Sequence, residues 1–293
     1  MKRSLRRAKE FALERLLFLS GTASVVFVVL IFVFLLREGA AVFGHVSLGH
    51  FLGAKFWYPI SSPAKLGILP LILGSLLVTA GALAIAVPLG IAAAFYIAEV
   101  APKRLRTVLK SCVEILSAIP SVVLGFLGIT LLVPFLKNFL GLPTGLTAFS
   151  GSLMLAFMAM PTIITISEDA INAVPREYKE GAVALGATHW QTLVRVVIHG
   201  AFPGIIAAAM LGIGRVIGET MAVMMVTGNA AVIPRTIFEP VRTLTATIAA
   251  EMGEAAQGTP HYHALFAVGI VLFLISFAIN LTADLFLNRG KKR

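Results

Sequence analysis

The sequence predicts an all-α, polytopic integral membrane protein with six transmembrane helices. Of its 293 residues, 58% are hydrophobic and only 13% are charged, whereas charged residues make up about a quarter of a typical soluble domain. A soluble globule of this size could not hide so much apolar side chain, because one core of limited thickness would leave much of it facing water. The same composition excludes a disordered chain. The expected solvent is a lipid bilayer.

Six apolar segments are long enough to span that bilayer. About 20 apolar residues, each rising 1.5 Å along a helix, cross a hydrocarbon core of roughly 30 Å. The segments are 16–36, 67–98, 112–136, 147–167, 202–229 and 264–287. The first is longer than a signal-peptide core and predicts a retained anchor, and Pro88 in the second predicts a kink or an interfacial end. With no repeat and no linker, residues 1–293 form one transmembrane domain.

The basic residues predict the orientation of the chain. Lys and Arg are concentrated in the N-terminal segment 1–15 and after the second, fourth and sixth spans, and they are sparse in the other connections. The positive-inside rule then puts both termini and the loop 168–201 in the cytoplasm of a multi-pass protein of the cell membrane. The net charge of +10 forms no basic face or aromatic-studded groove, so we expect no nucleic-acid binding.

The cytoplasmic loop 168–201 carries the signals of two short helices. Pro175 suits a first helical position, and Gly186 stands where a left-handed residue would end the first helix. Thr188 and Gln191 have the spacing of a capping box that starts the second. The sequence therefore predicts a helix pair on the inner side of the membrane.

This helix pair has two interpretations on its residues alone. After Glu180, the small residues Gly181 and Ala182 would let another surface approach the backbone closely. The pair is then a docking element for another protein. Alternatively, it is a solvated hairpin on the inner leaflet, which is the commoner arrangement for surface helices of this kind.

A resemblance favours the docking interpretation. The run Glu180-Gly-Ala-x-x-x-Gly186, followed by Val196-x-Ile198 and Pro203-Gly204, resembles the "EAA" loop of ABC importer permeases. In that family the loop forms a coupling helix that inserts into a cleft of the cytoplasmic ATPase. The resemblance implies that the ATPase is contacted by Glu180, Gly181, Ala182, Gly186 and Thr188. Two departures, Gly181 for the usual alanine and His199 for a common proline, leave the small-residue turn intact.

Further segments are similar to the phosphate-specific (Pst) permeases. These segments are 86–96, 114–128, 160–169 and 214–229. The sequences of 218–223 and 243–254 are more similar to the PstC type than to its PstA partner. The resemblance implies the type I ABC importer architecture. It also implies a second, PstA-like permease, an extracytoplasmic phosphate-binding protein and a cytoplasmic ATPase dimer that uses ATP and Mg²⁺, with no cofactor bound by this chain.

Two ionic residues in the predicted fifth span are the candidate substrate contacts. Arg215 falls at the centre of 202–229 and Glu219 one turn later, on the same helical face. An ionic residue at that depth costs about 2.5–3.5 kcal/mol on insertion scales, so the two either neutralise each other or face a pathway. A guanidinium would donate to phosphate oxygens, and a carboxylate would accept from the phosphate O–H, which sulfate lacks. Thr220 adds a hydroxyl, and Pst permeases carry an Arg and a Glu in this segment.

Nothing in the sequence suggests catalysis by this chain. It contains no phosphate-binding loop, nucleophile elbow or H-E-x-x-H helix. The only cysteine, Cys112, is interpreted as a small buried hydrophobic residue, and the histidines of the outer segments, His261 and His263 among them, as solvated. We therefore predict a transport subunit without a metal site, with ATP hydrolysis in a separate subunit.

The expected function is that of the permease of an ATP-driven importer of inorganic phosphate. Two alternatives stay open: a permease of the same architecture for another oxyanion such as molybdate or sulfate, and, with less support, a secondary transporter or channel. In the second alternative the intramembrane charges would relay protons or ions.

Overall fold

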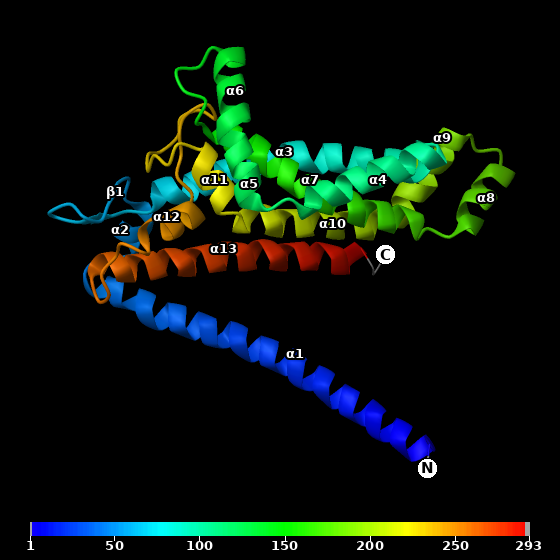
Figure 1. Ribbon diagram of the computed structural model, residues 1–293, viewed down its shortest axis with the longest axis horizontal. Helices are drawn as coiled ribbons and strands as arrows, with labels where there is room; N and C mark the ends of the chain where they lie inside the picture. Colours follow the sequence, from blue (N-terminus) through cyan, green and yellow to red (C-terminus); the bar gives the residue numbers. More distant parts are fainter. Residues whose placement is uncertain (1, 291–293) are drawn as a thin grey trace.

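The computed structural model describes residues 2–290, so that three of the basic residues used to orient the chain, Lys291, Lys292 and Arg293, lie outside it. Long helices run side by side, with the helix pair α8 (Arg176–Ala184) and α9 (His189–Thr192) at one end (Figure 1). At the opposite end lie a hairpin of β1 (Trp57–Tyr58) and β2 (Lys65–Leu66) and the short helices α2 (Leu48–Gly53) and α12 (Leu244–Glu251). We call these the inner and the outer end, after the orientation that the sequence predicts.

Within residues 2–290, six helical segments are long and apolar enough to cross a membrane, which confirms the predicted number. They are Leu13–Gly44, Leu69–Val100, Ser121–Leu140, Ala148–Asn172, His189–Gly218 and Pro260–Thr282. The first belongs to α1 (Lys2–Ala40), a continuous helix that includes most of the predicted N-terminal segment and ends in the 3₁₀ turn η1 (Ala41–Gly44). Large apolar side chains such as Leu17 and Phe18 are exposed along it, as a lipid-facing helix requires.

The first and last helices pack against each other through aromatic and small residues. α13 (Pro260–Gly290) lies beside α1, and Phe32 stacks on Phe273 with ring centroids 4.7 Å apart. At Gly39 the backbones approach so closely that a Cβ atom would lie 2.9 Å from the amide nitrogen of Ala267. Close approach at small residues is the usual way in which membrane helices associate.

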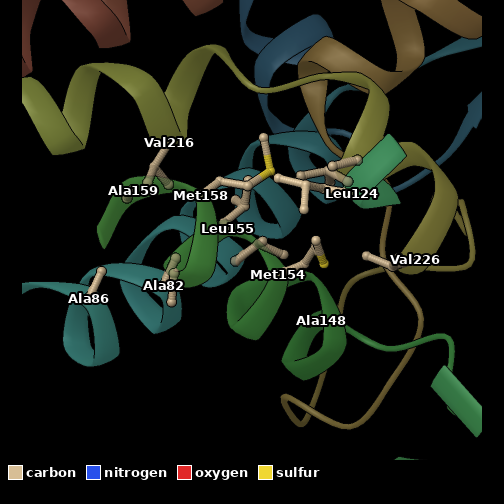
Figure 2. Packing of buried hydrophobic residues seen from close by; sticks show 14 of the residues in the cluster. Ala82, Ala86, Leu124, Ala148, Met154, Leu155, Met158, Ala159, Val216 and Val226 are labelled. Atoms are coloured by element: carbon tan, nitrogen blue, oxygen red, sulfur yellow. The ribbon is translucent and has the colours of Figure 1, made fainter. Parts of the chain in front are cut away.

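The central helix of the bundle is α7 (Ala148–Asn172). In the most apolar stretch of this helix 61% of the residues are buried, against 28% or fewer in the corresponding stretches of the other spans. Figure 2 shows α7 side chains, Leu155, Met158 and Ala159 among them, gathered with those of α3 (Leu69–Phe95) and α10 (Ile198–Gly218). α3 stays helical through Pro88 and changes to a π-helical turn, η2 (Tyr96–Val100), only at its inner end.

The third span begins later than predicted. α4 (Lys103–Ala118) is a separate amphipathic helix, and the span consists of α5 (Ser121–Leu127), the π-helical turn η3 (Gly128–Leu132) and α6 (Val133–Leu140). Pro120 causes the break, because it disfavours the helical conformation of the preceding Ile119, whose ψ is 127°. The predicted boundary at 112 is therefore wrong. Cys112 lies on α4 and is exposed, not buried.

The fifth span is also displaced from the predicted 202–229. It begins at α9, continues through the π-helical turn η4 (Leu193–Val197) into α10, and ends at Gly218. A short helix, α11 (Met221–Val226), follows after a break. Because α7 runs to Asn172, the connection between the fourth and fifth spans is residues 173–188 and not 168–201.

Candidate functional site

The break in the fifth span is the first candidate site. Glu219 follows the last residue of α10 in an extended conformation, with φ −70° and ψ 133°. Its Oε1 accepts hydrogen bonds from the amides of Thr220, at 3.1 Å, and Ala222, at 3.3 Å. The carboxylate therefore caps the first turn of α11, where a negative charge is favoured. The Thr220 hydroxyl donates to the carbonyl of Gly218 at 3.2 Å.

Arg215 lies in the last turn of α10 and not at the predicted centre of the fifth span, but its side chain contacts the middle of α7. Its Nη1 donates to the hydroxyl of Thr162 on α7 at 3.3 Å. Thr162 is 14 residues from one end of α7 and ten from the other, or roughly 21 and 15 Å at 1.5 Å per residue. The guanidinium therefore lies beside the middle of α7.

The prediction that Arg215 and Glu219 share one helical face is wrong, and of the two alternatives the structure does not show the ion pair. The two would share a helical face only if α10 continued, and α10 ends at Gly218. No salt bridge joins them, although both belong to the described part of the chain. The backbone amides of α11 satisfy the Glu219 carboxylate. The charge of Arg215 is consequently not neutralised within this segment.

One edge of α10 near these residues is uncovered by the chain. A Cβ atom at Gly214 or at Gly218 would meet nothing within 4 Å. Arg215 and Glu219 beside them are half-buried. An ionic residue at this depth is normally turned toward protein or a water-filled cavity, so this edge is where a partner or a pathway would be expected.

Threonines outside the predicted site complete its surroundings. Thr162 holds Arg215, and the hydroxyl of Thr245 on α12 donates to the carbonyl of Glu219 at 3.0 Å. Both threonines lie among apolar residues, and a hydroxyl in such a stretch was the only signal in the sequence that could have indicated them. A hydroxyl in a span can satisfy its hydrogen bond within its own helix, so the signal alone did not point to Arg215 or Glu219.

The inner helix pair has the predicted end signals. Gly186 adopts a left-handed φ of +84°. The amides of Gly186 and Ala187 donate to the carbonyls of Val183 and Ala182 at 2.9 and 3.0 Å, which is the Schellman arrangement. Thr188 begins α9 with a complete capping box. Pro175 precedes the first helical residue instead of occupying that position.

The surface of α8 is suited to contact another protein. None of its residues is buried, and Leu185, at the turn, is 91% exposed, with Tyr178, Val183 and Trp190 also exposed. A Cβ atom at Gly181 would meet nothing within 4 Å. Exposed apolar side chains gathered in this way mark interaction surfaces. Glu180, exposed on the same helix, adds a charge to the surface.

A polar cluster at the outer end was not predicted. The Glu251 carboxylate accepts from Trp57 Nε1 at 3.0 Å and from Arg242 Nη1 at 2.5 Å, and it lies 2.9 Å from His261 Nε2. These residues line a cavity of about 600 Å³. The prediction that His261 and His263 are solvated is wrong: the His261 side chain is only 12% exposed, and His263 Nδ1 lies 2.9 Å from the carbonyl of Glu38.

Comparisons with known proteins identify the family to which the chain belongs. The family described as binding-protein-dependent transport system inner membrane component matches residues 86–292. The chain is 42% identical to the probable ABC transporter permease protein YqgH of Bacillus subtilis over 84% of its own length and 80% of that protein. It is 38% identical to the phosphate transport system permease protein PstC of Mesorhizobium japonicum, over 82% and 78% of the two chains.

Solved structures show the same fold at low sequence identity. The bacterial alginate ABC transporter, solved in complex with a periplasmic protein bound to an alginate pentasaccharide, has a TM-score of 0.66 at 18% identity and covers 96% of each chain. The inward-facing MetNI methionine ABC transporter has a TM-score of 0.61 at 19% identity, over 76% of this chain and 97% of that one. These likenesses define the fold as that of a type I ABC importer permease.

The chain is therefore a multi-pass, non-catalytic subunit of a membrane transport system. It belongs to the binding-protein-dependent transport system inner membrane component family, and within that family to the permeases of the PstC type.

Proposed function

We propose that this permease carries inorganic phosphate across the cytoplasmic membrane in an ATP-driven importer, with both termini in the cytoplasm. The observation that carries the proposal is the Arg215 guanidinium, which lies beside the middle of α7, is held by Thr162, and has no ion pair with Glu219. A cation within a membrane span that has no ion pair attracts an anion. The similarity to PstC permeases supports phosphate as that anion.

The chemistry of the break suits a partly protonated oxyanion. A guanidinium presents planar N–H donors that match the oxygens of phosphate. The two amide hydrogen bonds to Glu219 both fall on Oε1, which leaves Oε2 to accept from a phosphate O–H. Thr220, the residue after Glu219, adds a further hydroxyl. The contact would be weak, because a conduit must release what it binds.

The remaining parts of the system would be separate subunits. A PstA-like permease would cover the open edge of α10, and a phosphate-binding protein would deliver substrate at the outer end. A dimeric ATPase, which uses ATP and Mg²⁺, would receive α8 and its turn through Glu180, Gly181, Ala182, Gly186 and Thr188. This chain would bind no cofactor of its own.

Reconstitution of the complete complex in lipid vesicles tests the proposal. ATP hydrolysis and uptake should both rise when the binding protein is loaded with phosphate. Stimulation by a sulfate or molybdate system's binding protein, and not by the phosphate-loaded one, would assign another oxyanion. Uptake that needs no ATPase and follows the membrane potential would contradict an ATP-driven importer and favour a secondary transporter.

A further inference from the structure

The position of α8 depends little on packing within the chain. None of its residues is buried, and its main neighbours are the segments that follow it, α9 and η4. Apolar burial is the usual force that fixes a short helix in place. Another interaction must therefore hold α8 in a defined position relative to the spans.

An ion pair between residues 80 positions apart supplies that interaction. Lys179 on α8 donates from Nζ to Glu99 Oε1. Glu99 belongs to η2, the π-helical turn at the inner end of α3. The Lys179 side chain is 28% exposed and that of Glu99 only 11%, so this pair is more sheltered from water than an ordinary surface salt bridge.

A pocket open to solvent lies between α8 and the start of the fifth span, beside this ion pair. Its volume is about 430 Å³, and Glu99, Lys179, Val183 and Thr192 contribute to its wall. Thr192 is 3% exposed, and its hydroxyl has no hydrogen-bond partner. Because side chains do not fill this space, α8 can shift without compressing a core. The ion pair between Lys179 and Glu99 lies at the edge of this unfilled space.

The two segments that α8 meets, η2 through the ion pair and η4 along the chain, are both π-helical. η2 ends the second span, and η4 (Leu193–Val197) lies near the start of the fifth. Segments with i→i+5 hydrogen bonds are rare, and they occur at functional sites in helices. A push on α8 would thus reach η4 along the chain, and η2 through Lys179 and Glu99.

We infer that Lys179 and Glu99 are positioning residues, which transmit the displacement of α8 to the second span during ATP-driven transport. The inference rests on the proposed function and deepens it. The fifth span receives the movement of α8 through the covalent chain, whereas the inner end of α3 has a direct link to α8 only through this ion pair. Without the pair, α8 moves with the ATPase while the second span lags behind. Hydrolysis then continues and transport per ATP falls.

Charge exchange in the full complex tests this. In vesicles, Lys179→Glu and Glu99→Lys should each lower the phosphate imported per ATP hydrolysed by roughly five- to tenfold, the scale of typical coupling energies. The double exchange should recover most of the ratio, and Lys179→Arg should keep it. A merely structural defect would lower the amount of active complex and leave this ratio unchanged. Lys103→Glu is the control, since Lys103 is an exposed cation at the start of α4.

A second measurement does not depend on phosphate. Amide hydrogen exchange at residues 96–100 of the assembled complex should be faster in each single variant and return toward the wild-type rate in the double exchange. Unchanged exchange in the single variants overturns the inference, even if the complex transports another solute. So does a double exchange that imports as little per ATP as the single variants, because Lys179 would then serve a contact other than Glu99.

Discussion

The indole Nε1 of Trp57 donates to the carboxylate of Glu251, 194 residues later in the chain, at 3.0 Å. This bond joins the hairpin of the first outer segment to the end of α12. Arg242 and His261 contact the same carboxylate, and Arg242 Nε also donates to the carbonyl of Asn229 at 2.9 Å. The Glu251 carboxylate thus contacts the hairpin, the segment before α12 and the start of α13, and Arg242 extends the network to the chain just beyond α11.

Trp57→Phe should loosen the outer end. The phenyl ring keeps an aromatic side chain in the buried position, although it is smaller than the indole, and one donor to a charged acceptor is lost, which by itself costs about 1.5–3 kcal/mol. We expect faster amide hydrogen exchange in residues 57–66 and a lower midpoint of thermal unfolding in detergent. Tyr58→Phe is the control, because Tyr58 is 51% exposed. Equal effects of the two substitutions would show that the bond to Glu251 contributes nothing.

Arg215→Gln should slow phosphate passage far more than it reduces assembly. Loss of a charge-assisted contact worth about 1.5–3 kcal/mol corresponds to roughly a tenfold or larger fall in the initial uptake rate. The measurement is radiolabelled phosphate uptake per assembled complex in vesicles. Thr162→Val removes the hydroxyl that holds the guanidinium and keeps its charge, so its effect should be smaller. If the loss of uptake only follows a loss of complex, Arg215 has a structural role alone.

Glu180→Lys should uncouple hydrolysis from transport. Glu180 is exposed on α8, so its reversal should not disturb membrane insertion, while it places the wrong charge on the surface offered to the ATPase. ATP turnover and phosphate uptake, measured together, should show uptake falling with hydrolysis maintained. Glu177→Lys, one turn earlier on the same helix, is the matched control. Normal uptake by the Glu180 variant would contradict the docking role.

Gly212→Ala should destabilise the bundle, whereas Gly214→Ala should not. A Cβ atom at Gly212 would lie 2.7 Å from Ile163 Cγ1, but one at Gly214 would meet nothing within 4 Å. Overpacking of this kind typically costs 1–3 kcal/mol, so about that loss is expected for the first variant. Thermal unfolding of the purified protein compares the two. Combining Gly212→Ala with Ile163→Ala should destabilise by less than the sum of the single effects, since the two residues share one contact. Strict additivity would show that they do not interact.

The sequence by itself determined the features that depend on neighbouring residues. Six spans follow from the lengths of the apolar segments, and the end of α8 follows from Gly186, because a residue without Cβ adopts positive φ at little cost. Thr188 and Gln191 begin α9 because a capping box is complete within four residues. Pro120 also marked the start of the third span, since the residue before a proline disfavours the helical conformation. That signal was in the sequence and was missed.

Tertiary structure alone decided how the ionic residues are used. Hydropathy continues across Gly218, so it could not show that α10 ends there and that Glu219 caps α11 instead of pairing with Arg215. The partners that matter are distant in the chain: Thr162 for Arg215, Glu99 for Lys179, and Trp57 for Glu251. Periodicity reports which face of a helix a residue occupies, but not which other helix meets that face. That choice is made by packing, where the close contacts of Gly90 and Gly212 with Ile163 align α3, α7 and α10.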